Sequence, residues 1–240
     1  RNPGPVHASL CRHDTGSLVR TGTPARVRTG RADLRPLPHH TRAGDGRCAY
    51  NVRLRPCPRN PPMQPDSIRA IVTGGVSGLG FAVAQRLVTD GGKVALLDVN
   101  DDKGAEAVAA LGAGNARYFR TDVTDEAGVA ATLEAARDFL GGLNAAISCA
   151  GVLGAGRVLG KDAPMPLDGF ARTVQINLVG SFNVAKAAAN LMQHNAPGVD
   201  GERGVIVNTA SVAAFEGQIG QAAYSASKGG VVGMTLPMAR

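Results

Sequence analysis

From residue 66 onward, short apolar segments alternate with longer segments of helical periodicity, and no other feature constrains the fold of this chain as strongly. Five strands are expected, at 68–73, 93–98, 116–121, 145–149 and 204–209. Helices are expected between and after them, at 78–91, 101–111, 125–140, 168–194 and 222–236. Continuously apolar strands are typical of a sheet covered by helices on both faces. The sequence therefore predicts an α/β fold, a doubly wound parallel sheet that stops after the helix following the fifth strand.

The first 62 residues differ from the rest in composition. They hold 12 arginines, no lysine or glutamate and three aspartates, a net charge of +9, whereas 63–240 carries a net charge of −2. Nine of the 14 prolines also fall before residue 63. Such a segment cannot bury enough apolar surface to offset its ordering entropy. We therefore expect 1–62 to be a disordered tail that adds no stability, and 63–240 to be an incomplete dinucleotide-binding domain.

Several interpretations of this tail compete. A nucleic-acid arm is disfavoured because its charges are dispersed and Tyr50 is its only aromatic residue. Cys48 and Cys57 lack the close pairing of a zinc site, and a transit peptide would contain more serine. We favour upstream sequence that is not native coding sequence, with translation starting at Met63. Because the basic charge belongs to the tail, a basic globule that binds nucleic acid is excluded.

Residues that suit a ligand site follow the expected strands. They are Thr73, Gly74 and Gly75 after the first strand, Asp98 at the end of the second, Asp122 after the third, Cys149, Ala150 and Gly151 at the fourth, and Ser211 after the fifth. In parallel sheets of this kind, ligands bind outside the carboxyl ends of the strands. Stability alone would not require this placement, so the sequence predicts a site at this edge of the sheet.

The segment TGGVSGLG at 73–80 lies between a strand and a helix, the context of a dinucleotide-binding turn in a Rossmann fold. Gly74 permits a tight turn, and Gly78 and Gly80 let the backbone approach a pyrophosphate at the helix N-terminus. Ser77 can add a hydroxyl hydrogen bond. Asp98, 18 residues after Gly80, can accept both ribose hydroxyls, and its charge would repel a 2′-phosphate. NAD is therefore favoured over NADP, although Asp98 could instead be a helix N-cap.

These motifs together resemble the short-chain dehydrogenase/reductase family. The resemblance covers about 66–240 and includes TGGVSGLG, Asp122-Val123, the CAG of 149–151, Asn177, Ser211 and the YSASK of 224–228. The stretch 208–240 is similar in more detail to the type-2 3-hydroxyacyl-CoA dehydrogenases, also described as 17β-hydroxysteroid dehydrogenases type 10. Cys149, where most of the wider family has asparagine, fits this subgroup.

The resemblance implies a role for each matching residue. Gly74, Ser77, Gly78, Leu79, Gly80, Asp98, Asp122, Val123, Cys149, Ala150, Gly151, Tyr224 and Lys228 would contact the cofactor NAD. Ser211 would bind the substrate oxygen, and Asn177 would hold a water of a proton relay that includes Tyr224 and Lys228. The segments 154–168 and 196–203 are similar in place to loops that help admit acyl-CoA. The reaction implied is the interconversion of 3-hydroxyacyl-CoA and 3-ketoacyl-CoA.

The chemistry of Tyr224 and Lys228 can also be argued from their spacing. Oxidation of a secondary alcohol needs a base for the hydroxyl proton, and a tyrosine phenol, with a reference pKa near 10, must be made more acidic to serve. Positions i and i+4 share one face of a helix, so the lysine ammonium can favour the phenolate. Ser211 would hydrogen-bond the developing oxygen charge.

Two alternatives to this function remain. One is an NADPH-dependent ketoacyl reductase, which Asp98 disfavours. The other is an inert dinucleotide-binding fragment, because the relatives that the chain resembles continue past Arg240. No metal site is expected, because the chain has no C-x₂-C or H-x₃-H pair. No membrane span is expected either, since no apolar run approaches 20 residues. A single cysteine in 63–240 favours the cytoplasm, with the mitochondrial matrix as the alternative, and the complete protein is expected to be a homo-tetramer.

Overall fold

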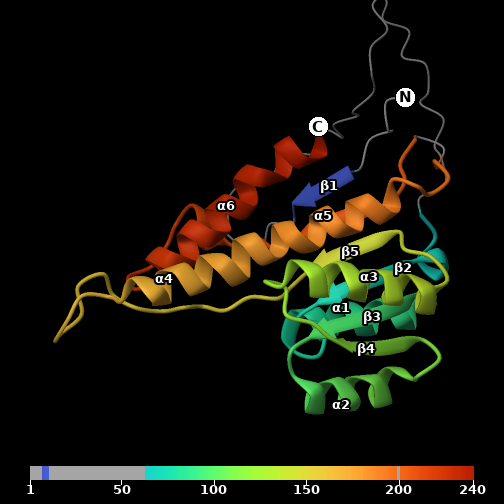
Figure 1. Ribbon diagram of the computed structural model, residues 1–240, viewed down its shortest axis with the longest axis horizontal. Helices are drawn as coiled ribbons and strands as arrows, with labels where there is room; N and C mark the ends of the chain where they lie inside the picture. Colours follow the sequence, from blue (N-terminus) through green and yellow to red (C-terminus); the bar gives the residue numbers. More distant parts are fainter. Residues whose placement is uncertain (1–6, 11–62, 199–200) are drawn as a thin grey trace, which may run out of the picture. The chain divides into compact units, whose positions relative to one another are not determined.

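The computed structural model describes residues 7–10, 63–198 and 201–240, all of which belong to one compact unit of the chain. Its parallel sheet has the strand order β1-β6-β5-β2-β3-β4 (Figure 1). The strands are β1 (His7–Leu10), β2 (Arg69–Thr73), β3 (Lys93–Asp98), β4 (Ala116–Arg120), β5 (Ala145–Ser148) and β6 (Val205–Asn208). Successive strands run outward on either side of β2, so the order reverses between β2 and β5. The carboxyl ends of these two strands are where such sheets bind ligands.

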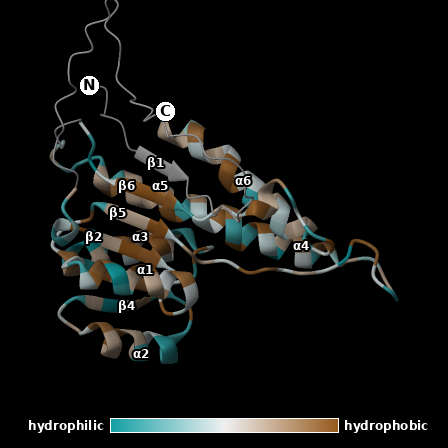
Figure 2. Cartoon of the chain, turned by 180° about the vertical axis from the view of Figure 1, so that it is seen from behind, coloured by the Kyte–Doolittle hydropathy of each residue, from teal (hydrophilic) through white to brown (hydrophobic). Residues whose placement is uncertain are grey.

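Helices connect the strands and cover both faces of the sheet. They are α1 (Gly78–Thr89), α2 (Asp101–Leu111), α3 (Glu126–Leu140), α4 (Leu167–Val174), α5 (Gly180–Met192) and α6 (Ala222–Ala239), with short helical turns η1 (Pro65–Ser67), η2 (Gln175–Val179) and η3 (Val212–Ala214). The doubly wound α/β fold expected from the sequence is confirmed. Figure 2 shows hydrophobic colours along the central strands, as expected for strands covered on both sides.

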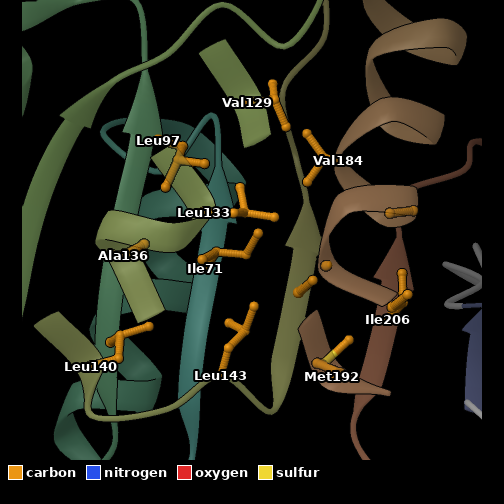
Figure 3. Close-up of a cluster of buried hydrophobic side chains, with 14 of the residues drawn as sticks. Ile71, Leu97, Val129, Leu133, Ala136, Leu140, Leu143, Val184, Met192 and Ile206 are labelled. Atoms are coloured by element: carbon orange, nitrogen blue, oxygen red, sulfur yellow. The ribbon is translucent and has the colours of Figure 1, made fainter. Parts of the chain in front are cut away.

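Alternate residues of each central strand point to opposite helical layers. On β3, Val94 and Leu96 are buried in a cluster with residues of α1 and α2. Ala95 and Leu97 are buried in the other cluster, which contains Leu133 of α3 and the buried side of α5 (Figure 3). The period of two residues along the strand therefore gives the sheet one apolar face for each helical layer.

The expected helix at 168–194 is interrupted. The structure has α4, then the π-helical turn η2, then α5. A π turn contains one more residue per hydrogen-bonded loop than an α turn, so it rotates the residues that follow it. Asn177 lies in η2, and the interruption therefore occurs at a residue expected to belong to the site.

The expectation that 1–62 lacks regular structure is wrong for four residues. β1 pairs in parallel with β6, in a register that joins His7 to Val205 and Leu10 to Asn208. β1 therefore pairs with the edge of β6 that faces away from β5. A backbone needs no apolar periodicity to add one strand to an existing edge, because the hydrogen bonds come from main-chain groups. The remainder of 1–62, with Cys48, Tyr50 and Cys57, lies outside the described residues.

Candidate active site

The turn after β2 brings Gly74 and Gly80 into close contact with neighbouring main-chain atoms. Gly74 has a φ of +62°, and its N–H donates to the Leu97 carbonyl at 2.8 Å. A Cβ on Gly74 would lie 2.8 Å from the Ala150 nitrogen, and one on Gly80 would overlap the Gly74 carbonyl oxygen. Side chains are therefore excluded at both positions, and β2, β5 and α1 meet there through their main chains.

The N-terminus of α1 faces outward from this turn. Ser77 is the N-cap residue, but its side chain makes no capping hydrogen bond. Gly78 has a φ of +52° and open space where a Cβ would be, and the Leu79 side chain is 64% exposed. The first N–H groups of a helix have no partner within the helix, so this end can hold a phosphate. The hydroxyl of Ser77 is free to add a further donor, as the sequence predicted.

Asp98 ends β3 beside this turn. Its Oδ1 accepts the N–H groups of Val99 at 2.8 Å and Asn100 at 3.2 Å. These bonds do not use Oδ2, which leaves an acceptor for ribose hydroxyls. The N-cap of α2 is Asn100, whose side chain accepts the Lys103 N–H at 3.0 Å. The alternative that Asp98 caps the helix is therefore wrong.

Asp122 and Val123 follow β4. The N–H and hydroxyl of Thr124 donate to Asp122 Oδ1 at 2.9 and 2.7 Å, and these bonds lower the pKa of the carboxyl. Val123 is buried, and its carbonyl accepts Asn183 Nδ2 at 3.0 Å. Asp122 is thus held by local bonds and Val123 by a bond from α5, at the edge of the sheet that carries Asp98.

Thr73 joins β2 to the segment after β5, a role that the sequence analysis missed. Its buried hydroxyl accepts the N–H groups of Cys149 and Ala150, each at 3.2 Å. These bonds fix the start of the CAG segment against the glycine turn. The only sequence signal was a threonine at a strand end, which is too common to indicate this contact.

Lys228 is the buried cation of the site. Only 6% of the residue is exposed, and its Nζ donates to the Thr209 carbonyl at 2.6 Å. The same Nζ lies 5.7 Å from the centroid of the Tyr224 ring. Burial lowers the pKa of Lys228, and the neighbouring Cys149 acts in the opposite direction. The i, i+4 spacing therefore places the ammonium beside the phenol, as the sequence predicted.

Thr209, which the sequence analysis also missed, connects this lysine to Cys149. Its Oγ1 lies 3.6 Å from the Cys149 Sγ, while its carbonyl holds Lys228. Burial raises the pKa of the Cys149 thiol, although Thr209 and Lys228 partly oppose this effect. A thiol kept protonated is a poor nucleophile, and the cofactor contact expected for Cys149 stays a prediction.

Asn177 is fully buried in η2 and uses both ends of its side-chain amide. Oδ1 accepts the Val152 N–H at 2.8 Å, and Nδ2 donates to the Val152 carbonyl at 2.8 Å and to Ser227 Oγ at 3.0 Å. The amide therefore ties the CAG segment to α6. Its expected part in a water relay stays a prediction, because both amide hydrogens already have protein partners.

Ser211 begins η3, which packs against α6. Its Oγ accepts the Ala213 N–H at 3.2 Å, and the hydroxyl hydrogen remains available for a substrate oxygen. The strand-end residues expected to form a site thus lie at one edge of the sheet, with Tyr224 and Lys228 on the helix that follows Ser211.

A hollow of about 300 Å³ lies next to the glycine turn, between α1 and α2, lined by Val76, Ser77, Phe81, Lys103, Glu106, Ala107 and Ala110. A larger one, of about 490 Å³, lies between α3 and α5 and includes none of the expected site residues. The described residues contain no cluster of side chains suited to a metal ion. Within the same part of the chain, no helix combines the length and hydropathy needed to cross a membrane.

The family model for short chain dehydrogenases matches residues 69–240, and the chain belongs to this family. Bovine 3-hydroxyacyl-CoA dehydrogenase type-2 is 50% identical over 173 residues, which cover 71% of this chain and 66% of the bovine protein. The crystal structure of 3-hydroxyacyl-CoA dehydrogenase type-2 from Mycobacterium avium has a TM-score of 0.68 and 39% identity, over 74% of this chain and 70% of that chain. An NAD⁺-bound xylitol dehydrogenase has a TM-score of 0.62 and 36% identity, over 71% and 64%. The chain thus spans slightly less than two thirds of the bovine relative.

Proposed function

We propose that this protein is an NAD-dependent oxidoreductase that interconverts a secondary alcohol and a ketone. The observation that carries the proposal is the buried Lys228 ammonium, 5.7 Å from the Tyr224 ring centroid and anchored on the Thr209 carbonyl. Burying a cation is costly unless it is paired or used. A cation held beside a half-buried phenol, at the ligand-binding edge of the sheet, has a chemical use in proton transfer.

Tyr224, Lys228 and Ser211 have separate roles in the proposed reaction. Tyr224 accepts the alcohol proton on its phenol oxygen, and the charge of Lys228 favours the phenolate that must form. Ser211 donates its hydroxyl hydrogen to the substrate oxygen. When bound, NAD supplies the acceptor for the hydride that leaves the carbinol carbon. In the reverse direction, Tyr224 returns the proton to the ketone oxygen.

NAD is the cofactor that the residues around the glycine turn fit best. The open helix N-terminus at Ser77 and Gly78 suits the pyrophosphate, and Asp98 Oδ2 suits the adenosine ribose. The same carboxylate disfavours NADPH and hence the alternative of an NADPH-dependent ketoacyl reductase. The NAD⁺ in the structurally similar xylitol dehydrogenase supports this choice.

The substrate we propose is a 3-hydroxyacyl-CoA. The names of the bovine and mycobacterial relatives support it. So does the extended segment at 152–166, which follows the CAG segment and carries exposed apolar side chains such as Leu153, Val158 and Leu159. We also propose a homo-tetramer in the cytoplasm, with the mitochondrial matrix as the alternative location. The remaining alternative, an inert dinucleotide-binding fragment, predicts cofactor binding without turnover.

The experiment compares Tyr224→Phe with the unmodified chain in NADH formation from a 3-hydroxyacyl-CoA and in NADH binding by fluorescence. Loss of the phenol should lower turnover about 10²–10⁴-fold and leave NADH affinity nearly unchanged. Lys228→Ala should damage both, whereas Lys93→Met, at the opposite end of β3, should change neither. More than a few per cent of the original rate in Tyr224→Phe would contradict the assignment. Binding of NADH with no turnover in the unmodified chain would favour the inert fragment.

A further inference from the structure

The turn between β3 and α2 is held from the neighbouring strand β4. The Tyr118 hydroxyl lies 3.0 Å from the Asp98 carbonyl oxygen and 2.9 Å from Asp101 Oδ1. Arg120, two residues further along the same face of β4, donates to the Val99 carbonyl at 2.8 Å and to Asp101 Oδ2 at 2.6 Å. Tyr118, Asp101 and Arg120 thus form a clamp on the main chain that carries Asp98, and we refer to these three residues as the turn clamp.

The ring of Tyr118 is wedged beneath α2. A Cβ on Gly104 would lie 2.6 Å from the ring carbons, so glycine is required there for the ring to fit. Burial and the hydrogen bond with Asp101 raise the pKa of Tyr118 to about 12, and the phenol therefore remains protonated near neutral pH. Packing against α2 fixes the position of the Tyr118 ring. The position of the ring in turn places its hydroxyl beside the turn between β3 and α2.

The clamp acts on the same turn that orients the Asp98 carboxylate. Oδ1 of Asp98 accepts the N–H groups of Val99 and Asn100, and the Val99 carbonyl accepts the Arg120 guanidinium. The Asp98 carbonyl and Asp101 Oδ1 share the single hydrogen of the Tyr118 hydroxyl. Both N–H groups and carbonyl groups of this turn are thus held by hydrogen bonds. With Oδ1 used in this way, the remaining oxygen, Oδ2, has one defined direction in which it can meet a ribose.

The clamp also determines which charges surround the ribose. The side chain of Arg120 is 64% exposed and lies at this edge of the sheet, where its guanidinium could attract a 2′-phosphate. Asp101 pairs with it and neutralises it. The negative charge of Asp98 is therefore left without a competing free cation in the clamp.

We propose that Tyr118, Asp101 and Arg120 are positioning residues that set the preference of this site for NAD over NADP. The inference rests on the proposed function, since it assumes that Asp98 binds the adenosine ribose. The preference for NAD over NADP would then depend on β4 and on the neutralised Arg120, in addition to the Asp98 carboxylate.

The test measures the affinities of NADH and NADPH by fluorescence titration of the 240-residue chain. Tyr118→Phe keeps the ring under α2 and removes the hydroxyl, and should weaken NADH binding on the order of fivefold. Asp101→Asn frees Arg120, so it should raise the affinity for NADPH and lower the ratio of NADPH to NADH dissociation constants on the order of tenfold. Arg120→Gln should weaken NADH binding without any gain for NADPH.

Two matched controls lie beside the clamp. Asp102→Asn makes the same charge change one residue along α2, and Arg117→Gln makes the same change on the opposite face of β4, where the arginine lies over Phe119. Both should leave the ratio of the two affinities within twofold of the unmodified chain. Amide hydrogen exchange at Val99 and Asn100, measured without nucleotide, should accelerate in Tyr118→Phe but not in the controls.

The outcomes distinguish failure of the proposed function from failure of the turn clamp alone. No NADH binding by the unmodified chain would overturn the proposed function and this inference with it. Normal NADH binding, together with an affinity ratio that moves equally in Asp101→Asn and Asp102→Asn, would overturn the inference alone. Unchanged exchange at Val99 and Asn100 in Tyr118→Phe would show that the clamp does not hold the turn.

Discussion

A side chain at Gly80 would overlap the carbonyl oxygen of Gly74, because α1 begins in direct contact with the turn that precedes it. Gly80→Ala should therefore push α1 away from β2 and lower the free energy of unfolding by about 1–3 kcal/mol, as overpacking does elsewhere. Urea unfolding followed by circular dichroism measures this change. NADH affinity should fall as well, because the displaced helix N-terminus is the proposed phosphate site.

Gly233 in α6, unlike Gly80, has room for a side chain. No atom lies within 4 Å of the position where its Cβ would be. Gly233→Ala should raise the free energy of unfolding by roughly 0.5–1 kcal/mol, since glycine inside a helix costs about that much relative to alanine. If both substitutions shifted the urea curve in the same direction, the packing assigned to the glycine turn would be incorrect.

Some residues of the candidate site could be predicted from the sequence, and others could not. Gly74, Asp98, Tyr224 and Lys228 could be assigned because their spacing along the chain carries a local requirement: a turn, a strand end or one helix face. The contacts of Thr73 and Thr209 could not be predicted, because they join segments that are distant in sequence, such as Thr73 with Cys149. Their roles depend on which strands become neighbours, which single-chain spacing does not encode.

At the scale of elements, strands β2 to β6 and most helices follow from hydrophobic periodicity, and the exceptions are β1 and η2. Periodicity predicted one helix over 168–194, because the apolar positions of α4 and α5 each fit a helical repeat. A π turn adds a residue without any proline or glycine to mark it. Its cause is tertiary: Asn177 must reach Val152 on one side and Ser227 on the other.

Asn177→Ala tests this account of η2. The substitution leaves the main chain of Val152 and the hydroxyl of Ser227 without their amide partner, and each unsatisfied buried group costs about 1–3 kcal/mol. The urea midpoint should therefore fall clearly. Asn190→Ala, on the exposed side of α5, should change the free energy of unfolding by no more than about 0.5 kcal/mol. A similar response of the two variants would show that the buried amide does not hold the π turn.

At the scale of the whole molecule, β1 changes what is expected of the N-terminal segment. The composition of 1–62 predicted no contribution to stability, yet the main chain of His7–Leu10 continues the sheet next to β6 and lies beside α6. An edge strand left unpaired is a site for association between chains. A chain that begins at Met63 should therefore unfold at lower urea concentration and scatter more light near its midpoint than the full chain.

The double substitution Ala8→Pro with Ser9→Pro isolates the strand from the rest of 1–62. N–H groups of adjacent strand residues point to opposite sides, so one of the two prolines must remove a donor that faces β6. The loss should be about 0.5–1.5 kcal/mol for each ladder hydrogen bond broken. Ala8→Val with Ser9→Thr keeps both donors and favours a strand, and should leave the urea curve unchanged or shift it upward. Identical curves for the full chain, the chain from Met63 and the proline variant would instead restore the expectation drawn from composition, that this segment adds nothing to the stability of the sheet.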